Sequence, residues 1–157
     1  MEHLKSFGID EKRGNYKEET MYALALLFNI ANSEISTYLG DFELSPAKFN
    51  VLMVIKHQGG KKGINQVDIS KQLIVTPSNM TRLLDKLERE GFVYRSAQEG
   101  DRRVNIIKIS DKGSKVLDDA WPGYKSKLKE LTDELEERDQ EILASILKKW
   151  LRKLMEE

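Results

Sequence analysis

Two predicted helices near the middle of this chain lie so close together that only a short turn can join them. Asn65 can cap a helix over residues 66–73. Thr76 and Pro77 begin the next helix, since a hydroxyl cap followed by proline is a typical helix start. Because only two residues separate the first helix from the second cap, the pattern predicts a helix-turn-helix.

The second of these helices is amphipathic. Its apolar residues follow the spacing i, i+3, i+4, i+7 and form one stripe: Met80, Leu83, Leu84 and Leu87. Polar and charged residues remain outside the stripe: Ser78, Asn79, Thr81, Arg82, Asp85, Lys86 and Arg89. Taken alone, this helix is equally well explained as an ordinary amphipathic helix with a solvated face.

The polar face has the chemistry for reading DNA bases. Asn79 can pair with adenine and Arg82 with guanine, and the shorter side chains allow a close approach to base edges. The free amides at the helix start, next to Thr76 and Pro77, can receive a phosphate. The helix therefore has the groups expected of a helix that enters a major groove.

A β-hairpin is predicted directly after this helix. Residues 92–96 and 104–109 are short β-prone runs, separated by a polar loop over 97–103 that contains a glycine. That loop carries Asp101 and the two arginines that follow it, Arg102 and Arg103. A charged turn is unremarkable by itself. Beside a helix-turn-helix, however, a basic loop can reach the minor groove next to the helix, and the two features together predict DNA binding.

The remaining segments are predominantly helical. A helix is predicted over 16–39, ended by a glycine, and another from Pro46 to about residue 57. After the hairpin, Ser110 caps a further helix, which Pro122 is expected to kink or break. Helical spacing resumes over 128–154. The predicted order is α-α-α-α-β-β-α-α, a mainly α (α+β) chain.

Composition places the chain among ordinary one-domain proteins. It has 157 residues, of which 39% are hydrophobic, and no cysteine for a disulfide or a thiol sensor. The chain shows no apolar run of about 18 residues and no signal peptide, so we expect a soluble, cytoplasmic protein without a membrane partner. The net charge is zero, yet residues 61–103 hold nine basic and six acidic residues whereas residues 1–60 hold six and eight. Positive charge is thus modestly concentrated around the predicted helix-turn-helix.

The residues give no support for catalysis. The chain has no nucleophile–base pairing, no glycine-rich phosphate loop and no cluster of metal-ligand residues. Its two histidines, His3 and His57, are too far apart in sequence to suggest a metal site. We therefore expect a protein that is not an enzyme and that carries no cofactor.

The chain resembles the MarR family of bacterial and archaeal winged helix-turn-helix regulators. The matching segments are 81–88, Gly91-Phe92-Val93-Tyr94-Arg95, Asp101-Arg102-Arg103 and 109–113. Ser110 stands where threonine is more usual, which exchanges one helix cap for another. The helix order and the proline-containing helix also match, so the resemblance covers nearly the whole chain.

This resemblance implies roles for individual residues. The residues implied to face the major groove or its flanking phosphates are Ser78, Asn79, Thr81, Arg82 and Lys86. Arg103 would enter the minor groove, and Arg102 would contact phosphate or share that role. Asp101 would orient a wing arginine, because phosphates repel a carboxylate. An arginine in a narrow minor groove favours A·T-rich sequence.

Dimerisation is expected from surplus apolar residues at both ends. The stripe over 142–155, together with Leu4, Phe7 and Ile9, exceeds what a small monomer's surface needs. The stripe could instead complete the core of its own subunit, but the resemblance favours a homodimer. The expected domains are residues 1–40 for dimerisation, 41–112 for the winged helix-turn-helix (wing about 92–109) and 113–157 for the C-terminal dimerisation helices.

A small aromatic effector is a further expected partner, because members of the family often bind such molecules between the dimerisation helices and the DNA-binding unit. Five aromatic residues are candidates to line that site, although an aromatic on a helical stripe is usually a core residue: Tyr22, Phe28, Phe49, Trp121 and Tyr124. The sequence itself does not identify an effector.

The leading hypothesis is a sequence-specific DNA-binding transcriptional regulator of MarR type. We expect a ligand-responsive repressor that binds a pseudo-palindromic operator on double-stranded DNA as a homodimer. The alternative is a winged-helix module that uses the same face to bind an acidic protein. Exposed Asn79 and Arg82, which suit base edges, count against that alternative.

Overall fold

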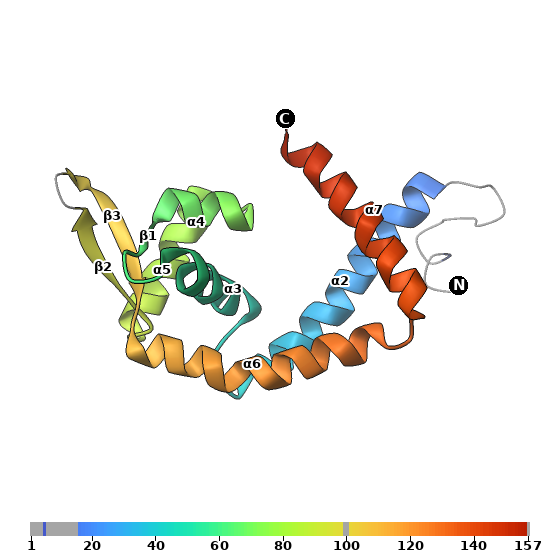
Figure 1. Ribbon diagram of the computed structural model, residues 1–157, viewed down its shortest axis with the longest axis horizontal. Helices are drawn as coiled ribbons and strands as arrows, with labels where there is room; N and C mark the ends of the chain where they lie inside the picture. Colours follow the sequence, from blue (N-terminus) through green and yellow to red (C-terminus); the bar gives the residue numbers. More distant parts are fainter. Residues whose placement is uncertain (1–4, 6–15, 99–100, 157) are drawn as a thin grey trace.

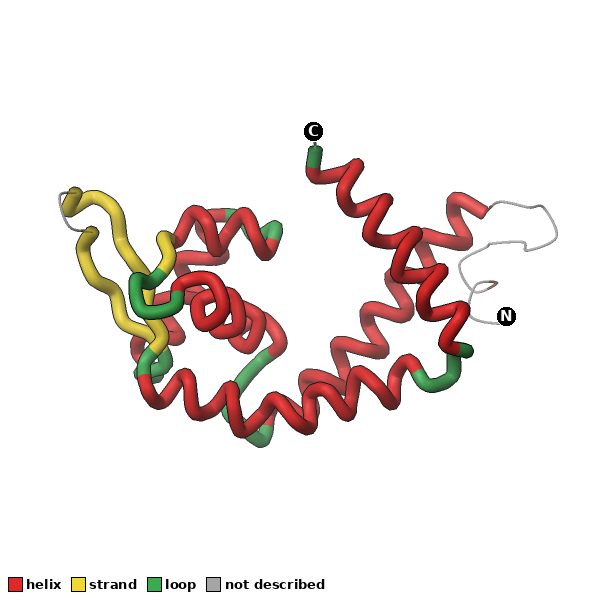
Figure 2. Tube along the Cα trace, viewed as in Figure 1, coloured by secondary structure: helices red, strands yellow, loops and turns green. Residues whose placement is uncertain are grey.

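The computed structural model describes residue 5 and residues 16–98 and 101–156, with side-chain surroundings for all of these except 97, 98 and 101–104. Helices predominate, and the strands gather at one end of an elongated, arched chain (Figures 1 and 2). The predicted Leu4, Phe7 and Ile9 cluster lies outside the described residues, as does His3.

The elements follow the predicted order with two additions. The helices and strands are α2 (Tyr16–Gly40), α3 (Pro46–Val54), the π-helical turn η2 (Ile55–Gly59), β1 (Ile64–Asn65), α4 (Gln66–Leu73), α5 (Pro77–Arg89), β2 (Val93–Gln98), β3 (Asp101–Ile109), α6 (Asp111–Thr132) and α7 (Glu137–Met155). The prediction missed the π-helical turn and strand β1. The mainly α fold with a small sheet confirms the predicted fold class.

Side-chain caps explain where several helices begin. Ser45 accepts a hydrogen bond from the Lys48 amide, and Asn65 accepts one from the Asp68 amide. Ser110 likewise accepts from the amide of Gly113 at the start of α6. Each bond satisfies a backbone donor that has no partner within its helix. These three predicted starts are confirmed.

The sheet is antiparallel, with strand order β1-β3-β2. In β3, Ile107 pairs with Ile64 of β1 on one side and with Arg95 of β2 on the other. The β2–β3 pairing continues to Gln98 opposite Asp101, with a register shift next to Ala97. The predicted loop over 97–103 was therefore too long. Polar residues can continue an exposed two-stranded ribbon because backbone groups make its hydrogen bonds.

One core holds the helix-turn-helix, the sheet and the start of α6 together. Its buried hydrophobic residues are Leu39, Leu44, Phe49, Val51, Leu52, Ile55, Ile69, Met80, Leu84, Leu87, Phe92, Val93, Ile107, Leu117 and Ala120. Buried Met80, Leu84 and Leu87 and half-buried Leu83 confirm the apolar stripe predicted for α5. Their burial orients the polar side of α5 toward solvent.

Helix α6 runs through Pro122 without a break, so of the two predicted outcomes, a kink or a break, the break is wrong. The helix bows along its length in Figure 1. Proline removes one backbone donor and would leave the carbonyl of Asp118 without its helical partner. Asp118 and Pro122 are both exposed, so water can bond that carbonyl. The Tyr38 hydroxyl also donates to the Ala120 carbonyl at 2.9 Å, which fastens this stretch of α6 to α2.

Helix α3 is shorter than predicted, because the α-helical pattern stops at Val54 and a π-helical turn carries the chain on to Gly59. Gly60 then takes a positive φ of 47°, a conformation that glycine adopts without strain. The turn brings the chain to β1, which joins the sheet beside β3. Among the described residues, no helix is long and apolar enough to span a membrane.

Candidate nucleic-acid interface

Helix α5 presents the polar face that the sequence predicted. Ser78, Asn79, Arg82 and Lys86 are all exposed. Thr76 and Pro77, at the helix start, are exposed as well. The helix begins at Pro77 as predicted, but the predicted side-chain cap is wrong: the hydroxyl of Thr76 makes no capping bond and instead lies 3.4 Å from the hydroxyl of Ser78. The amides of the first turn therefore remain available to an anion.

Thr81 is more constrained than its neighbours on this face. Its hydroxyl donates to the carbonyl of Pro77 at 3.0 Å and accepts from the side-chain amide of Gln66 at 2.7 Å. With its proton already used, this hydroxyl can offer a DNA base only an acceptor. Gln66 begins α4, so the bond ties the two helices of the motif together. The sequence reasoning overlooked Gln66, whose only signal was its place after the Asn65 cap.

The turn between α4 and α5 is tight. Ile74 takes a left-handed conformation with φ 52° and ψ 44°, and the amide of Val75 donates to the carbonyl of Ser70 at 3.1 Å. Ser70 is 8% exposed, and its hydroxyl donates to the backbone carbonyl of Gln66 at 3.0 Å, so its one polar side-chain group is satisfied next to the turn. A β-branched residue rarely adopts this conformation, so the turn stores strain.

The β2–β3 ribbon, which is the predicted wing, adjoins α5, the second helix of the motif and here called the recognition helix, since β2 packs against α5. Asp101, Arg102 and Arg103 lie at the start of strand β3 and not in a loop, because pairing begins at Asp101. Their backbone follows the ribbon that projects from the end of the molecule in Figure 1, while their side chains lie outside the described set. The expected roles of these three residues remain predictions.

An arginine that the sequence reasoning did not single out joins the wing to the helix. Arg95 of β2 forms ion pairs with Asp85, at 2.6 Å between guanidinium nitrogen and carboxylate oxygen, and with Glu88. Its backbone amide also donates to Glu88 at 3.2 Å. Asp85, expected on the solvated face, is therefore engaged with the wing. No pattern within one element could have revealed this bridge.

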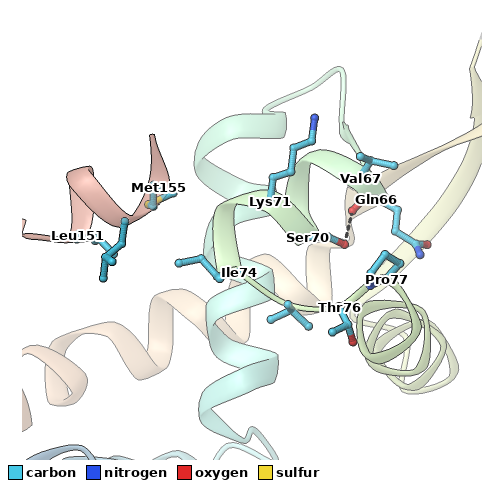
Figure 3. A pocket seen from close by; sticks show the side chains of 11 residues that line it. Gln66, Val67, Ser70, Lys71, Ile74, Thr76, Pro77, Leu151 and Met155 are labelled. Atoms are coloured by element: carbon cyan, nitrogen blue, oxygen red, sulfur yellow. Dashed lines mark hydrogen bonds between the residues drawn. The ribbon is translucent and has the colours of Figure 1, made fainter. Parts of the chain in front are cut away.

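A cleft of about 950 Å³ lies behind the turn, between α4 and the end of α7 (Figure 3). In this view, Ile74 lies at the end of α4 nearer to α7, opposite Leu151 and Met155, while Val67 lies at the other end of α4; all four residues line the cleft. Val67 is 60% exposed and Ile74 is 69% exposed. The cleft is thus lined on one side by apolar residues of the helix-turn-helix and on the other by the apolar stripe of the C-terminal helix.

The predicted effector residues are only partly brought together. Phe49, Trp121 and Tyr124 form a ring cluster, with the centroids of Phe49 and Tyr124 4.5 Å apart. Phe28, Phe49 and Tyr124 line a cavity of about 140 Å³, whereas Tyr22 is not among its lining residues. Burial raises the pKa of the Tyr124 hydroxyl above its ordinary value.

No metal centre appears in the described part of the chain, where no group of three or more histidine, aspartate, glutamate or cysteine residues could hold an ion. His57 lies in the π-helical turn. The site therefore consists of a polar helix face, a short strained turn and an adjoining β-ribbon. Together with the helical order and the three-stranded sheet, these features define a winged helix-turn-helix protein.

Comparisons with known proteins identify the family. The MarR family model matches residues 44–104. The chain is 27% identical over 126 residues to the HTH-type transcriptional regulator MhqR of Bacillus subtilis, covering 80% of this chain and 85% of MhqR. It is also 27% identical over 124 residues to the transcriptional repressor YetL of the same organism, covering 77% of this chain and 74% of YetL.

A solved structure agrees with these matches. A mutant of Escherichia coli MarR in complex with operator DNA superposes with a TM-score of 0.81 at 25% identity, covering 87% of this chain and 96% of that one. The chain therefore belongs to the MarR family of transcriptional regulators. The relatives compared above are named as regulators of transcription and not as enzymes.

Proposed function

We propose that this protein is a transcriptional repressor that binds a pseudo-palindromic operator as a homodimer in the cytoplasm. The observation that carries the proposal is the exposed polar face of α5 with the β2–β3 ribbon packed beside it. Such a pair can contact a major groove and the adjoining minor groove of one duplex. The repressor role is supported by the name of YetL, and DNA binding by the operator complex of E. coli MarR.

The proposed roles follow the positions on α5 and β3. Asn79 and Arg82 read bases in the major groove, with support from Ser78 and from the acceptor that Thr81 retains. Lys86 contacts phosphate, and the helix-start amides next to Thr76 and Pro77 do the same. In the wing, Arg103 enters the minor groove, Arg102 binds phosphate beside it and Asp101 orients one of these arginines.

Homodimerisation is supported by the exposed apolar residues of α7. Ile142, Leu143 and Ile146 are 41–56% exposed, and no residue of α7 is buried within its own subunit. A second copy would cover this stripe and supply a second recognition helix. Two-fold symmetry then places the two helices on half-sites about one turn of DNA apart.

An effector site is proposed for the cavity between α2, α3 and α6. About 140 Å³ is close to the volume that holds one benzene ring. Phe28 of α2, Phe49 of α3 and Tyr124 of α6 supply its aromatic walls, and Asn32 and Asn50 supply amides for a polar substituent. A small aromatic molecule bound there would join the dimerisation helices to the DNA-binding unit and could shift the spacing of the two recognition helices.

A gel-shift titration at several salt concentrations tests the proposed function, using a duplex selected by the wild-type protein from a random pool. Arg103→Ala should weaken binding by about 1–3 kcal/mol and relax the preference for A·T pairs in the flank. Lys86→Ala should weaken binding to all duplexes and lower the salt slope by about one unit. Wild-type affinity in both variants at every salt concentration would contradict these roles. The absence of any salt-dependent binding to duplex DNA would instead favour a protein-binding module.

A further inference from the structure

Helix α5 carries two carboxylates that a DNA-binding helix would be expected to avoid. Asp85 and Glu88 are three residues apart, so they lie on one side of the helix. At 49% and 37% side-chain exposure, neither is buried away from an approaching duplex. Phosphates repel such groups, and the two carboxylates also repel each other. Their presence on the recognition helix requires a compensating contact.

Arg95 supplies that contact from the wing. Its guanidinium binds one oxygen of each carboxylate, and its backbone amide binds the remaining oxygen of Glu88. The planar guanidinium has a fixed donor geometry, so bonds to two acceptors restrict its orientation as well as its distance. Three bonds from one residue therefore fix both the separation of β2 from α5 and the rotation of the strand about its own axis.

The place of Arg95 in the strand makes this attachment important for the wing. Arg95 pairs with fully buried Ile107 at the base of the ribbon, and the pairing ends at Gln98 opposite Asp101. The strand positions of Arg102 and Arg103 follow directly along β3. A small rotation of β2 at Arg95 would move these positions by a larger distance, because they lie farther along the projecting ribbon.

We propose that Arg95 is a positioning residue that holds the wing in register with the recognition helix, so that one duplex meets both at once. This inference rests on the proposed DNA-binding function and adds a residue to it. Arg95 acts through Arg103 and need not touch DNA itself. Ion pairs at this exposure contribute little to folding stability, so their removal should leave the fold intact.

A set of variants separates positioning from charge compensation. Arg95→Met keeps an unbranched, flexible side chain but lacks the guanidinium, so it removes the bridge and leaves two uncompensated carboxylates. The triple variant Arg95→Met, Asp85→Asn, Glu88→Gln removes the bridge and both negative charges together. If Arg95 only neutralised the carboxylates, the triple variant would bind like the wild type. If it positions the wing, the triple variant remains defective.

The test uses the full-length dimer and a duplex selected from a random pool, with hydroxyl-radical footprinting and titration at several salt concentrations. Arg95→Met should lose protection of the flanking minor groove while keeping protection of the central major groove. Its affinity should fall about tenfold, as for the loss of one specific contact, and its salt slope should fall by about one unit. Arg95→Lys should be intermediate, because it keeps the charge without the two-acceptor geometry.

Lys56→Met is the matched control. It breaks a 2.6 Å ion pair to Asp118, which links the π-helical turn to α6 and involves no side chain of α5, β2 or β3. This variant should bind the duplex like the wild type. Both it and Arg95→Met should melt within a few degrees of the wild type, since partly exposed pairs of this kind add little stability.

Three outcomes would overturn the inference: retained flank protection in Arg95→Met, wild-type affinity in the triple variant, or a fall in melting temperature that matches the loss of binding across the Arg95 series. The proposed function fails separately, if the wild-type protein protects no duplex. Loss of flank protection in Arg103→Ala but not in Arg95→Met would uphold the proposed function and reject the positioning role.

Discussion

The molecule has two regions that are built differently. The winged unit runs from α3 to β3 and includes the first turns of α6. The arm consists of α2, the rest of α6 and α7. Every buried hydrophobic residue among those described lies between Leu39 and Ala120, mostly within the winged unit. Helix α7 has no buried residue, and α2 has only Leu39. The winged unit completes a core from its own residues, whereas the arm exposes apolar side chains that a second copy can cover.

The largest expected effect comes from a charge placed on the apolar side of the arm, because it tests whether a second copy covers that side. Ile146 is 56% exposed in α7, so Ile146→Asp should leave the subunit folded. In a dimer the carboxylate would be buried among apolar groups, which costs several kcal/mol. We expect the dimer to dissociate at micromolar concentration and operator binding to fall with it. Sedimentation velocity and a gel shift measure the two effects.

Ser145→Asp is the matched control for this variant. Residue 145 is the exposed neighbour of Ile146 and points about 100° away around the helix. It adds the same charge without replacing an apolar side chain, and it should remain dimeric. A stable dimer of Ile146→Asp would show that the stripe of α7 is not the contact between subunits.

A smaller change in folding stability is expected when one glycine from each region is replaced by alanine. A Cβ on Gly113 would overlap the carbonyl oxygen of Phe92, which the Ser110 amide and hydroxyl each hold at 3.0 Å. Gly113→Ala should therefore destabilise the winged unit by about 1–3 kcal/mol, since backbone must move. The atoms nearest to a Cβ on Gly123 in the arm would be those of the ring and hydroxyl of Tyr38. Tyr38 can shift more easily than backbone can, at the cost of its hydrogen bond to the Ala120 carbonyl, and alanine favours the helix, so Gly123→Ala should cost less stability than Gly113→Ala, about 1 kcal/mol.

Chemical denaturation of both variants at one protein concentration measures this difference. The winged unit is the more rigid region if the loss at Gly113 exceeds the loss at Gly123. Equal losses of stability would mean that Tyr38 is held as rigidly against α6 as the backbone of Phe92 is held in the winged unit. The arm would then be more tightly packed than its exposure suggests.

The same contrast explains what could be predicted from the sequence. Asn65 and Ser110 were recognised as caps because a cap and its helix are adjacent in the chain. The stripe of α5 was likewise a local pattern. Arg95 was missed because its partners lie seven and ten residues back in another element, and only folding brings them together. A two-residue strand such as β1 has no periodicity to detect. The path of α6 through Pro122 depended on solvent access and on Tyr38, neither of which a local pattern reveals.

The smallest expected effect lies at the cleft where the two regions face each other. Ile74 is strained at φ 52° and is 69% exposed, so its side chain contributes little burial within the subunit. Asparagine tolerates this conformation, and Ile74→Asn should raise the free energy of unfolding by about 1 kcal/mol. Val67→Asn is the control: Val67 is similarly exposed on the same wall but lies within α4, where asparagine relieves no strain and should give no gain.

The free energy of unfolding of Ile74→Asn, measured at two protein concentrations, tests whether the second copy covers the cleft. If the apolar wall of the helix-turn-helix stays open in the dimer, the gain should be the same at both concentrations. If the second copy covers Ile74, the variant loses apolar burial only when dimeric, and its gain should shrink or reverse as concentration rises. That reversal would show that the winged unit, which completes its own core, also contributes to the contact between subunits.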